Sequence, residues 1–213
     1  MMRRAARLLL SMLLLAGASR AAADDFDFYV LSLSWSPTWC ASNDHDGSTT
    51  QCDGRRPYRF IVHGLWPQNE RGWPEYCPSR EPERVPRALA ETMMDIIPSA
   101  GLAGHEWRKH GSCSGLNQRS YFQTLRNAHD KVRLPPVIFD GRIPRRLAID
   151  EIEGLMTKAN PGLTRQGVSV SCQGGRLTEI RICMTKSLEF RTCREVDRKS
   201  CRARTVNLPA IKG

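Results

Sequence analysis

Eight cysteines are the feature of this 213-residue chain that most restricts its fold. Their even number is typical of a set of disulfide bonds, which form and persist in oxidising compartments rather than in the cytosol. Eight in 213 is nevertheless below the roughly 8–10% of cysteine that marks a fold held together mainly by bridges. We therefore expect the bridges to reinforce a hydrophobic core that a domain of this length forms by itself.

The N-terminal segment indicates export. Three arginines precede an apolar stretch at 8–18, and three alanines at 21–23 supply the small residues of a cleavage site. We expect a signal peptide over 1–23 and a mature domain over 24–213 that is secreted or periplasmic. Cleavage removes four of the 32 lysines and arginines, so the formal charge falls from +10 to +6. No apolar run reaches the roughly 20 residues of a membrane span, so no association with a membrane is expected.

Patterns typical of β-strands occur near both ends of the mature chain. Residues 28–35 and 58–63 are rich in aromatic and β-branched side chains. Residues 168–172 and 177–184 flank Gly174-Gly175, a sequence typical of a tight hairpin.

Helical patterns lie between these strands. Apolar residues recur at helical spacing in residues 87–97, 120–134 and 144–158. Prolines at every fourth position from 74 to 86 exclude a helix there and predict a long surface connection. Strands at both ends with helices between them indicate a single α+β domain, with a central antiparallel sheet and helices packed around it.

Residues 104–113 (GHEWRKHGSC) hold the densest group of reactive side chains. On a helix, Glu106, Lys109 and His110 would share one face, with His105 on its flank. Histidine suits proton transfer because its ordinary pKa lies near neutrality. The alternative is a solvated helix face with an ordinary surface ion pair. A zinc site is disfavoured, because the two histidines lie five residues apart instead of the four of the His-Glu-x-x-His motif.

A second segment, residues 60–68 (FIVHGLWPQ), supplies a partner for this group. A lone histidine in an apolar strand is more often a hydrogen-bonded core residue than a catalyst. A reaction that removes one proton and donates another, however, needs two groups in opposite protonation states. His63 and His110 are candidates for that pair, and Trp66 offers an aromatic face on which a nucleobase could stack.

These two segments resemble, in order, the two active-site motifs of the ribonuclease T2 family. Residues 31–40 (LSLSWSPTWC) also resemble the first strand of the family and its Trp-x-Pro turn ahead of a cysteine. Beyond these blocks the resemblance consists of the order of the cysteines and of the expected elements. Two positions depart from the pattern: Arg108 stands where the family often has an acidic residue, and Ser112 where threonine is usual.

The resemblance implies a ribonuclease T2-like fold and cleavage of single-stranded RNA without a metal or other cofactor. It implies attack by the ribose 2′-hydroxyl, a 2′,3′-cyclic phosphate and then 3′-phosphate ends, so DNA is not expected to be cleaved. We expect a monomer. The implied roles are general acid for His63, general base for His110, phosphate contact for His105, transition-state support for Glu106 and Lys109, and lining of the substrate site for Trp66.

Eight cysteines allow 105 pairings, so the residues alone do not choose among them. The resemblance implies that one bridge ties the proline-rich connection to the catalytic helix. The implied pairs are Cys40–Cys52, Cys77–Cys113, Cys172–Cys201 and Cys183–Cys193.

Two alternatives to the ribonuclease hypothesis are a catalytically inactive RNA- or protein-binding member of the fold and, less favoured, a zinc hydrolase. In the arginine-rich residues 191–204 no aromatic side chain interleaves the arginines, which favours a solvated loop over an RNA-binding surface.

Overall fold

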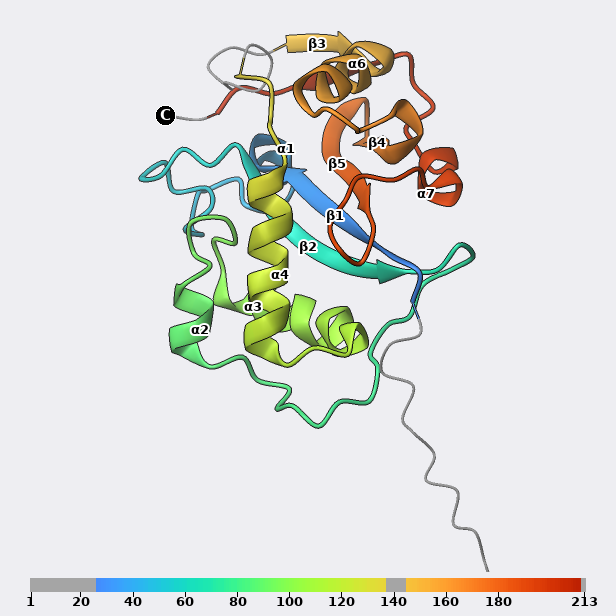
Figure 1. Cartoon of the computed structure of the whole chain (residues 1–213). Coiled ribbons are helices and arrows are strands. Elements are labelled where there is room, and N and C mark those ends of the chain that lie inside the picture. The colour runs from blue at the N-terminus through green and yellow to red at the C-terminus, as the bar shows by residue number, and fades with distance from the viewer. Residues whose placement is uncertain (1–25, 137–144, 212–213) are drawn as a thin grey trace, which may run out of the picture.

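Strand β1 (Phe28–Trp35) lies inside a sheet and is buried along its whole length. It pairs antiparallel with β2 (Phe60–Gln68) on one side and with β5 (Arg176–Met184) on the other (Figure 1). Two buried leucines of β1 belong to the main hydrophobic core. Ser32 and Ser34 alternate with them, so the opposite face of β1 carries small side chains over part of its length.

The computed structural model describes residues 26–136 and 145–211, and it contains a six-stranded sheet with the order β2-β1-β5-β6-β3, in which β4 also pairs with β5. Antiparallel ladders dominate, which confirms the expected α+β class. The remaining strands are β3 (Arg145–Ala148), β4 (Val168–Gln173) and β6 (Thr205–Leu208). The α-helices are α1 (Ser36–Asn43), α2 (Arg87–Glu91), α3 (Ala100–Lys109), α4 (Gln118–Lys131), α6 (Ile149–Ala159) and α7 (Arg194–Arg198).

Strand β2 contains a β-bulge at His63. Ser32 of β1 lies opposite Gly64 and Leu33 lies opposite Val62, so His63 is an extra residue without a direct partner. In an unbroken strand, residues three apart point to opposite faces. The bulge changes this alternation, so that Val62 and Leu65 both enter the core while the rings of His63 and Trp66 meet on the other face, 5.3 Å apart.

Helices α3 and α4 pack beside β2 and hold it in place (Figure 1). The buried Tyr121 of α4 donates a hydrogen bond of 3.0 Å to the carbonyl of Leu65. Trp107 of α3 is buried against Tyr121, and its indole Nε1 donates to the carbonyl of Pro82 in the proline-rich connection. Each of the two helices thus contributes a buried aromatic side chain that also donates a hydrogen bond to a backbone carbonyl.

Two helix predictions differ from the structure. The helix expected over 144–158 is preceded by a strand, because residues 145–148 pair with β6 near the end of the chain and only α6 is helical. The helix expected over 87–97 stops at Glu91 and continues as turns. The predicted hairpin is confirmed, and Gly174 and Gly175 have φ angles of +57° and +72° that suit its tight turn.

All eight cysteines are paired as the resemblance implies. The bridge between Cys77 and Cys113 joins the proline-rich connection to the turn that follows α3. The two C-terminal bridges join β4 and β5 to the residues on either side of α7. Part of the arginine-rich segment, expected to be a loop, is therefore the short helix α7. The expected signal peptide lies outside the described residues. Among the described helices, none is long and apolar enough to cross a membrane.

Candidate active site

A cavity of about 340 Å³ opens on the face of the sheet that carries His63. It is lined by side chains from β2, α3 and β5, and by residues of α7 and the connection that follows β2. All six predicted site residues line it, so the structure brings together two sequence segments more than 35 positions apart. These residues are His63, Trp66, His105, Glu106, Lys109 and His110.

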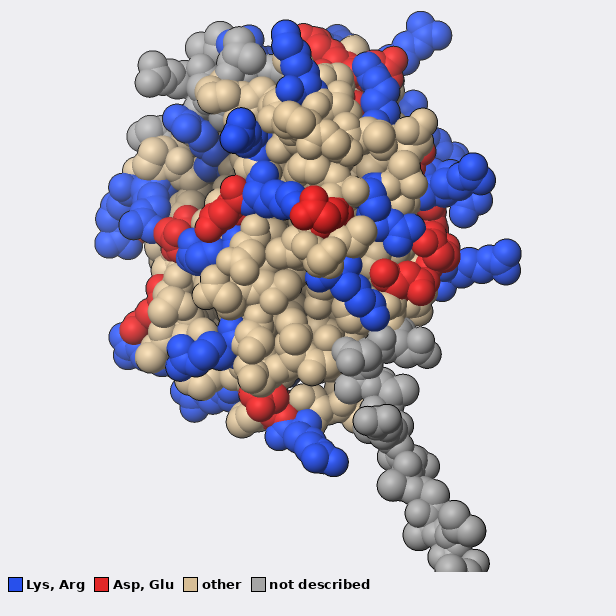
Figure 2. Space-filling view, viewed as in Figure 1, with Lys and Arg blue, Asp and Glu red and all other residues tan. Residues whose placement is uncertain are grey.

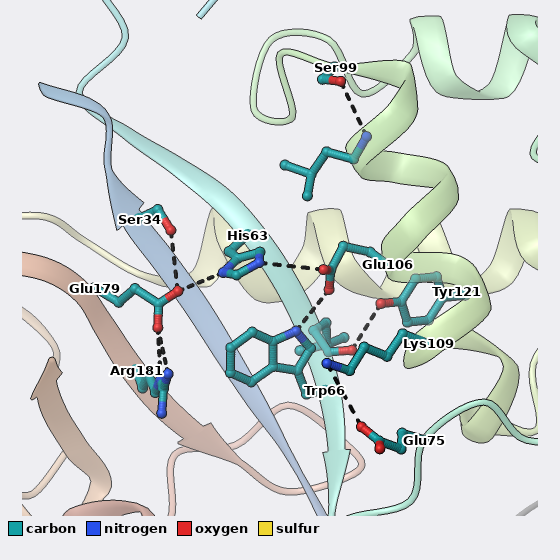
Figure 3. A network of polar contacts seen from close by, with 12 residues as sticks. Ser34, His63, Trp66, Glu75, Ser99, Glu106, Lys109, Tyr121, Glu179 and Arg181 are labelled. Atoms are coloured by element: carbon teal, nitrogen blue, oxygen red, sulfur yellow. Dashed lines mark hydrogen bonds and ion pairs between the residues drawn. The ribbon is translucent and has the colours of Figure 1, made fainter. Parts of the chain in front are cut away.

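Helix α3 begins and ends at well-anchored residues, and this positions its polar face. The Ser99 hydroxyl accepts a hydrogen bond from the Leu102 amide and caps the N-terminus (Figure 3). At the other end, the Lys109 carbonyl accepts from the Tyr76 amide, and the disulfide of Cys113 follows directly. The end of the helix that carries the reactive residues is therefore braced against the proline-rich connection.

Glu106 lies almost fully buried between the two motifs. Its Oε2 accepts a hydrogen bond of 2.8 Å from the indole Nε1 of Trp66, and its Oε1 lies 3.6 Å from His63 Nε2 (Figure 3). Burial raises the pKa of this carboxyl to about 7, although the nearby charge of His63 and the Trp66 hydrogen bond oppose the shift. Glu106 can therefore exist in either protonation state near neutrality.

His63 has a carboxylate on each of its ring nitrogens. Besides Glu106 at Nε2, its Nδ1 donates a 2.6 Å hydrogen bond to Glu179 Oε1. Burial lowers the pKa of His63, but the hydrogen bond to Glu179 and the negative charges of Glu106 and Glu179 outweigh burial, so the pKa lies above its ordinary value. These contacts thus favour the charged imidazolium form of His63.

His110 has the opposite electrostatic environment. Its ring is buried and stacks on Trp66 with the ring centroids 5.2 Å apart. Burial lowers its pKa to about 3, and the positive charges of Lys109, His63 and His105 act in the same direction. Its Nδ1 has no hydrogen-bond partner among the described residues. Two histidines of one cavity therefore have pKa values shifted in opposite directions.

Lys109 and His105 also line the cavity. Lys109 Nζ is 3.8 Å from Glu75 Oε2 and remains partly exposed (Figure 3). Burial lowers the pKa of His105, and the charges of Lys109 and Arg108 lower it further. No three His, Cys, Asp or Glu side chains in the described part of the chain are arranged to hold a metal ion.

The structure adds residues that the sequence motifs did not reveal, chiefly Glu179 and Arg181 of β5. A signal for them exists, because they are charged positions two residues apart among the apolar residues of the second half of the strand. That signal does not say which strand they adjoin, since the pairing of β1 with β5 joins residues about 150 positions apart in the chain. Glu75 and Trp73, in the connection after β2, were missed because no local pattern marks them.

The sequence profile of the Ribonuclease T2 family matches residues 26–193. The chain belongs to the ribonuclease T2 family. It is 35% identical to a ribonuclease of Aeromonas hydrophila over 79% of this chain and 76% of the relative. It is 29% identical to ribonuclease I of Escherichia coli over 74% and 75%. The solved structure of trichomaglin, described as a novel S-like ribonuclease, has the same fold, with a TM-score of 0.70, 22% identity and coverage of 89% of this chain and 100% of that one.

Positive and negative charges are mixed on the face of the molecule that Figure 2 shows. Figure 2 shows lysines and arginines spread over the visible face with acidic residues among them. In the arginine-rich segment, Arg191 pairs with Glu70 and packs over the ring of Phe28, while Lys199 pairs with Glu195 and lies over Trp73. The fold thus brings aromatic partners to a segment that has none in sequence. Several of its charges are already paired, so the cavity carries more functional information than the net charge.

Proposed function

We propose that the protein is a metal-independent endoribonuclease that cleaves single-stranded RNA through the ribose 2′-hydroxyl. The observation that carries the proposal is the pair of histidines in one cavity with oppositely shifted pKa values. Membership of the ribonuclease T2 family supports RNA as the substrate. Two fixed proton carriers suit this reaction, because RNA holds its own nucleophile next to the phosphorus and attack is effectively unimolecular.

The two histidines have different tasks in the first step. Neutral His110 takes the proton of the 2′-hydroxyl while the O2′–P bond forms. The P–O5′ bond breaks, and the 5′ oxygen receives a proton from the charged His63, leaving a 2′,3′-cyclic phosphate. In a later step water opens the cyclic phosphate to a 3′-phosphate, with the two histidines in exchanged roles.

The remaining residues stabilise charge or position the substrate. Lys109 presents its ammonium group to the cavity, where a fixed cation stabilises the negative charge that develops on the phosphoryl oxygens. Glu106, when protonated, donates a hydrogen bond to one of those oxygens, and His105 contacts the phosphate. Trp66 positions the Glu106 carboxyl through the hydrogen bond from its indole nitrogen. The ring of Trp66 packs against His110 and Arg181, and these contacts fix its orientation. The half-exposed Trp73 at the cavity, whose ring also lies under Lys199, offers an aromatic surface for a base.

The test compares an RNA strand with the matching all-deoxy strand, in EDTA, and identifies the product ends. We expect cleavage of RNA only, with cyclic and then 3′-phosphate ends. Cleavage of the deoxy strand, or loss of activity in the chelator, would overturn the proposal and would favour the zinc hydrolase alternative. No contact in the cavity favours the inactive binding member, since both proton carriers are present.

Single substitutions test the two histidines. His63→Ala and His110→Ala are each expected to reduce kcat/KM by several orders of magnitude, since general acid and base catalysis contribute roughly 10²–10⁴-fold each. The matched control is His129→Ala, because His129 lies on α4, is not among the residues that line the cavity, and pairs with the neighbouring Asp130. A modest loss at His63 or His110 would make that residue structural.

A further inference from the structure

Glu179 reaches His63 across an intervening strand. The pairing of β1 with β5 sets Ser34 opposite Glu179 and Ser32 opposite Arg181, while β2 lies on the other side of β1. Because the two serines are small, the side chains of His63 on β2 and Glu179 on β5 can meet over β1 (Figure 3). The contact therefore depends on three strands and is not a chance approach of exposed side chains.

The Glu179 carboxylate has no freedom to turn away. Its Oε1 accepts from His63 Nδ1 at 2.6 Å and faces the Ser34 hydroxyl at 3.4 Å. Its Oε2 accepts two hydrogen bonds from Arg181, at 2.9 Å from Nε and 2.7 Å from a terminal nitrogen. The side chain is nearly buried, and its charge is matched by Arg181 on one oxygen and by the imidazolium on the other.

A carboxylate in this position acts on a histidine in two ways. It accepts the Nδ1 proton and so fixes which nitrogen is free to exchange a proton with the substrate, and it stabilises the charged ring. In this site the other nitrogen, Nε2, points toward Glu106 and the cavity.

We propose that Glu179, clamped by Arg181, is a positioning residue of the reaction: it holds His63 Nε2 toward the leaving 5′ oxygen and keeps the ring protonated until that oxygen departs. This inference rests on the proposed function, because it requires His63 to act as the general acid.

The charges that face His63 from each neighbouring element support this reading. Glu106 faces it from α3 and Glu179 from β5, and both favour the charged ring. Arg181 on β5 has the opposite effect. The charge of His63 in turn lowers the pKa of His105 on α3. Replacing Glu179 with glutamine removes the largest influence that opposes burial, so the pKa of His63 should fall. Because the acid must be protonated, the basic limb of the kcat/KM profile should move to lower pH.

The experiment uses two substrates that differ in their need for an acid. A dinucleotide releases an alkoxide that must be protonated, whereas a nucleoside 3′-(4-nitrophenyl phosphate) diester releases a phenolate that leaves without a proton. We expect Glu179→Gln to lower kcat/KM by roughly 100-fold for the dinucleotide, comparable to a misplacement of 1 Å, and to change little for the aryl ester. The matched control is Glu153→Gln, a nearly buried glutamate on α6 that also faces an arginine, and it should change neither substrate.

His63→Ala, measured on the same two substrates, separates the two proposals. Equal losses on both substrates with His63→Ala would refute the role of His63 as acid and thus the proposed function. A selective loss with His63→Ala but an equal loss, or none, with Glu179→Gln would refute only the role of Glu179. If Glu179→Gln does not fold, nitrogen-15 NMR of the wild-type histidines decides the question. We expect Nδ1 of His63 to keep its proton when Nε2 loses its own, and loss of the proton from Nδ1 first would overturn the inference.

Discussion

Replacing Gly64 with alanine tests whether the contact between Glu106 and Trp66 is needed for activity. Gly64 directly follows the bulge in β2, and a Cβ atom there would lie 1.9 Å from Glu106 Oε2 and 2.4 Å from Trp66 Nε1. These are the two atoms of the 2.8 Å hydrogen bond between the motifs. The added methyl group and that hydrogen bond cannot occupy the same space.

The size of the effect follows from these distances. Ordinary van der Waals contact begins at 3.4 Å, so Oε2 must retreat by about 1.5 Å from its place. A buried hydrogen bond to a charged group contributes about 1.5–3 kcal/mol, and its loss also leaves the buried Glu106 carboxyl without the donor from Trp66. We therefore expect a Tm that is lower by roughly 3–12 °C for a domain of this size, at about 2–4 °C per kcal/mol. A catalytic group displaced by more than 1 Å should reduce kcat/KM by at least about 100-fold.

The assay measures Tm and the rate of RNA cleavage for Gly64→Ala beside Gly101→Ala. Gly101 lies in α3, where a Cβ would meet only the Ser99 hydroxyl oxygen, at 3.4 Å. That control should keep full activity and gain up to about 1 kcal/mol from helix propensity. If Gly64→Ala keeps both its Tm and its activity within a fewfold range of the wild type, the reasoning about Glu106 is wrong.

Two other perturbations have defined outcomes. Lys109→Gln removes a positive charge that lowers the pKa of His110, so this pKa should rise from about 3, and the acidic limb of the kcat/KM profile should move to higher pH; an unshifted His110 titration by NMR would contradict this. Cys77→Ser/Cys113→Ser opens a loop with a sequence separation of 36, which by loop entropy costs about 4 kcal/mol of unfolding free energy. Urea unfolding measures that cost, and an unchanged midpoint would show that the brace on α3 contributes nothing.

Local sequence patterns predicted which residues line the candidate site better than they predicted the partners of those residues. Glu106, Lys109 and His110 lie within five positions of one another, and one helix followed by its cap is enough to bring them together. His63 and Trp66 were predictable from their motif. Their shared face was not, since it requires a bulge that the apolar pattern of β2 does not mark.

Long-range pairing accounts for the larger misses. Residues 145–148 continue an apolar pattern of helical spacing, yet they form a strand because residues 205–208 supply the backbone partners. Glu179 was missed for the same reason, since its contact with His63 depends on two ladders that join distant parts of the chain. Proline spacing, by contrast, correctly excluded a helix before residue 87, because a missing amide proton acts locally.

The bulge at His63 has a consequence for how related chains are compared. The residue count between His63 and Trp66 carries as much information as their identities, because one residue more or fewer would turn one of the two rings into the core. An alignment with a one-position gap inside this motif therefore pairs a chain in which the two rings share a face with a chain in which they do not. The number of residues between His63 and Trp66 is therefore a stricter criterion for an intact site than the similarity of the residue types.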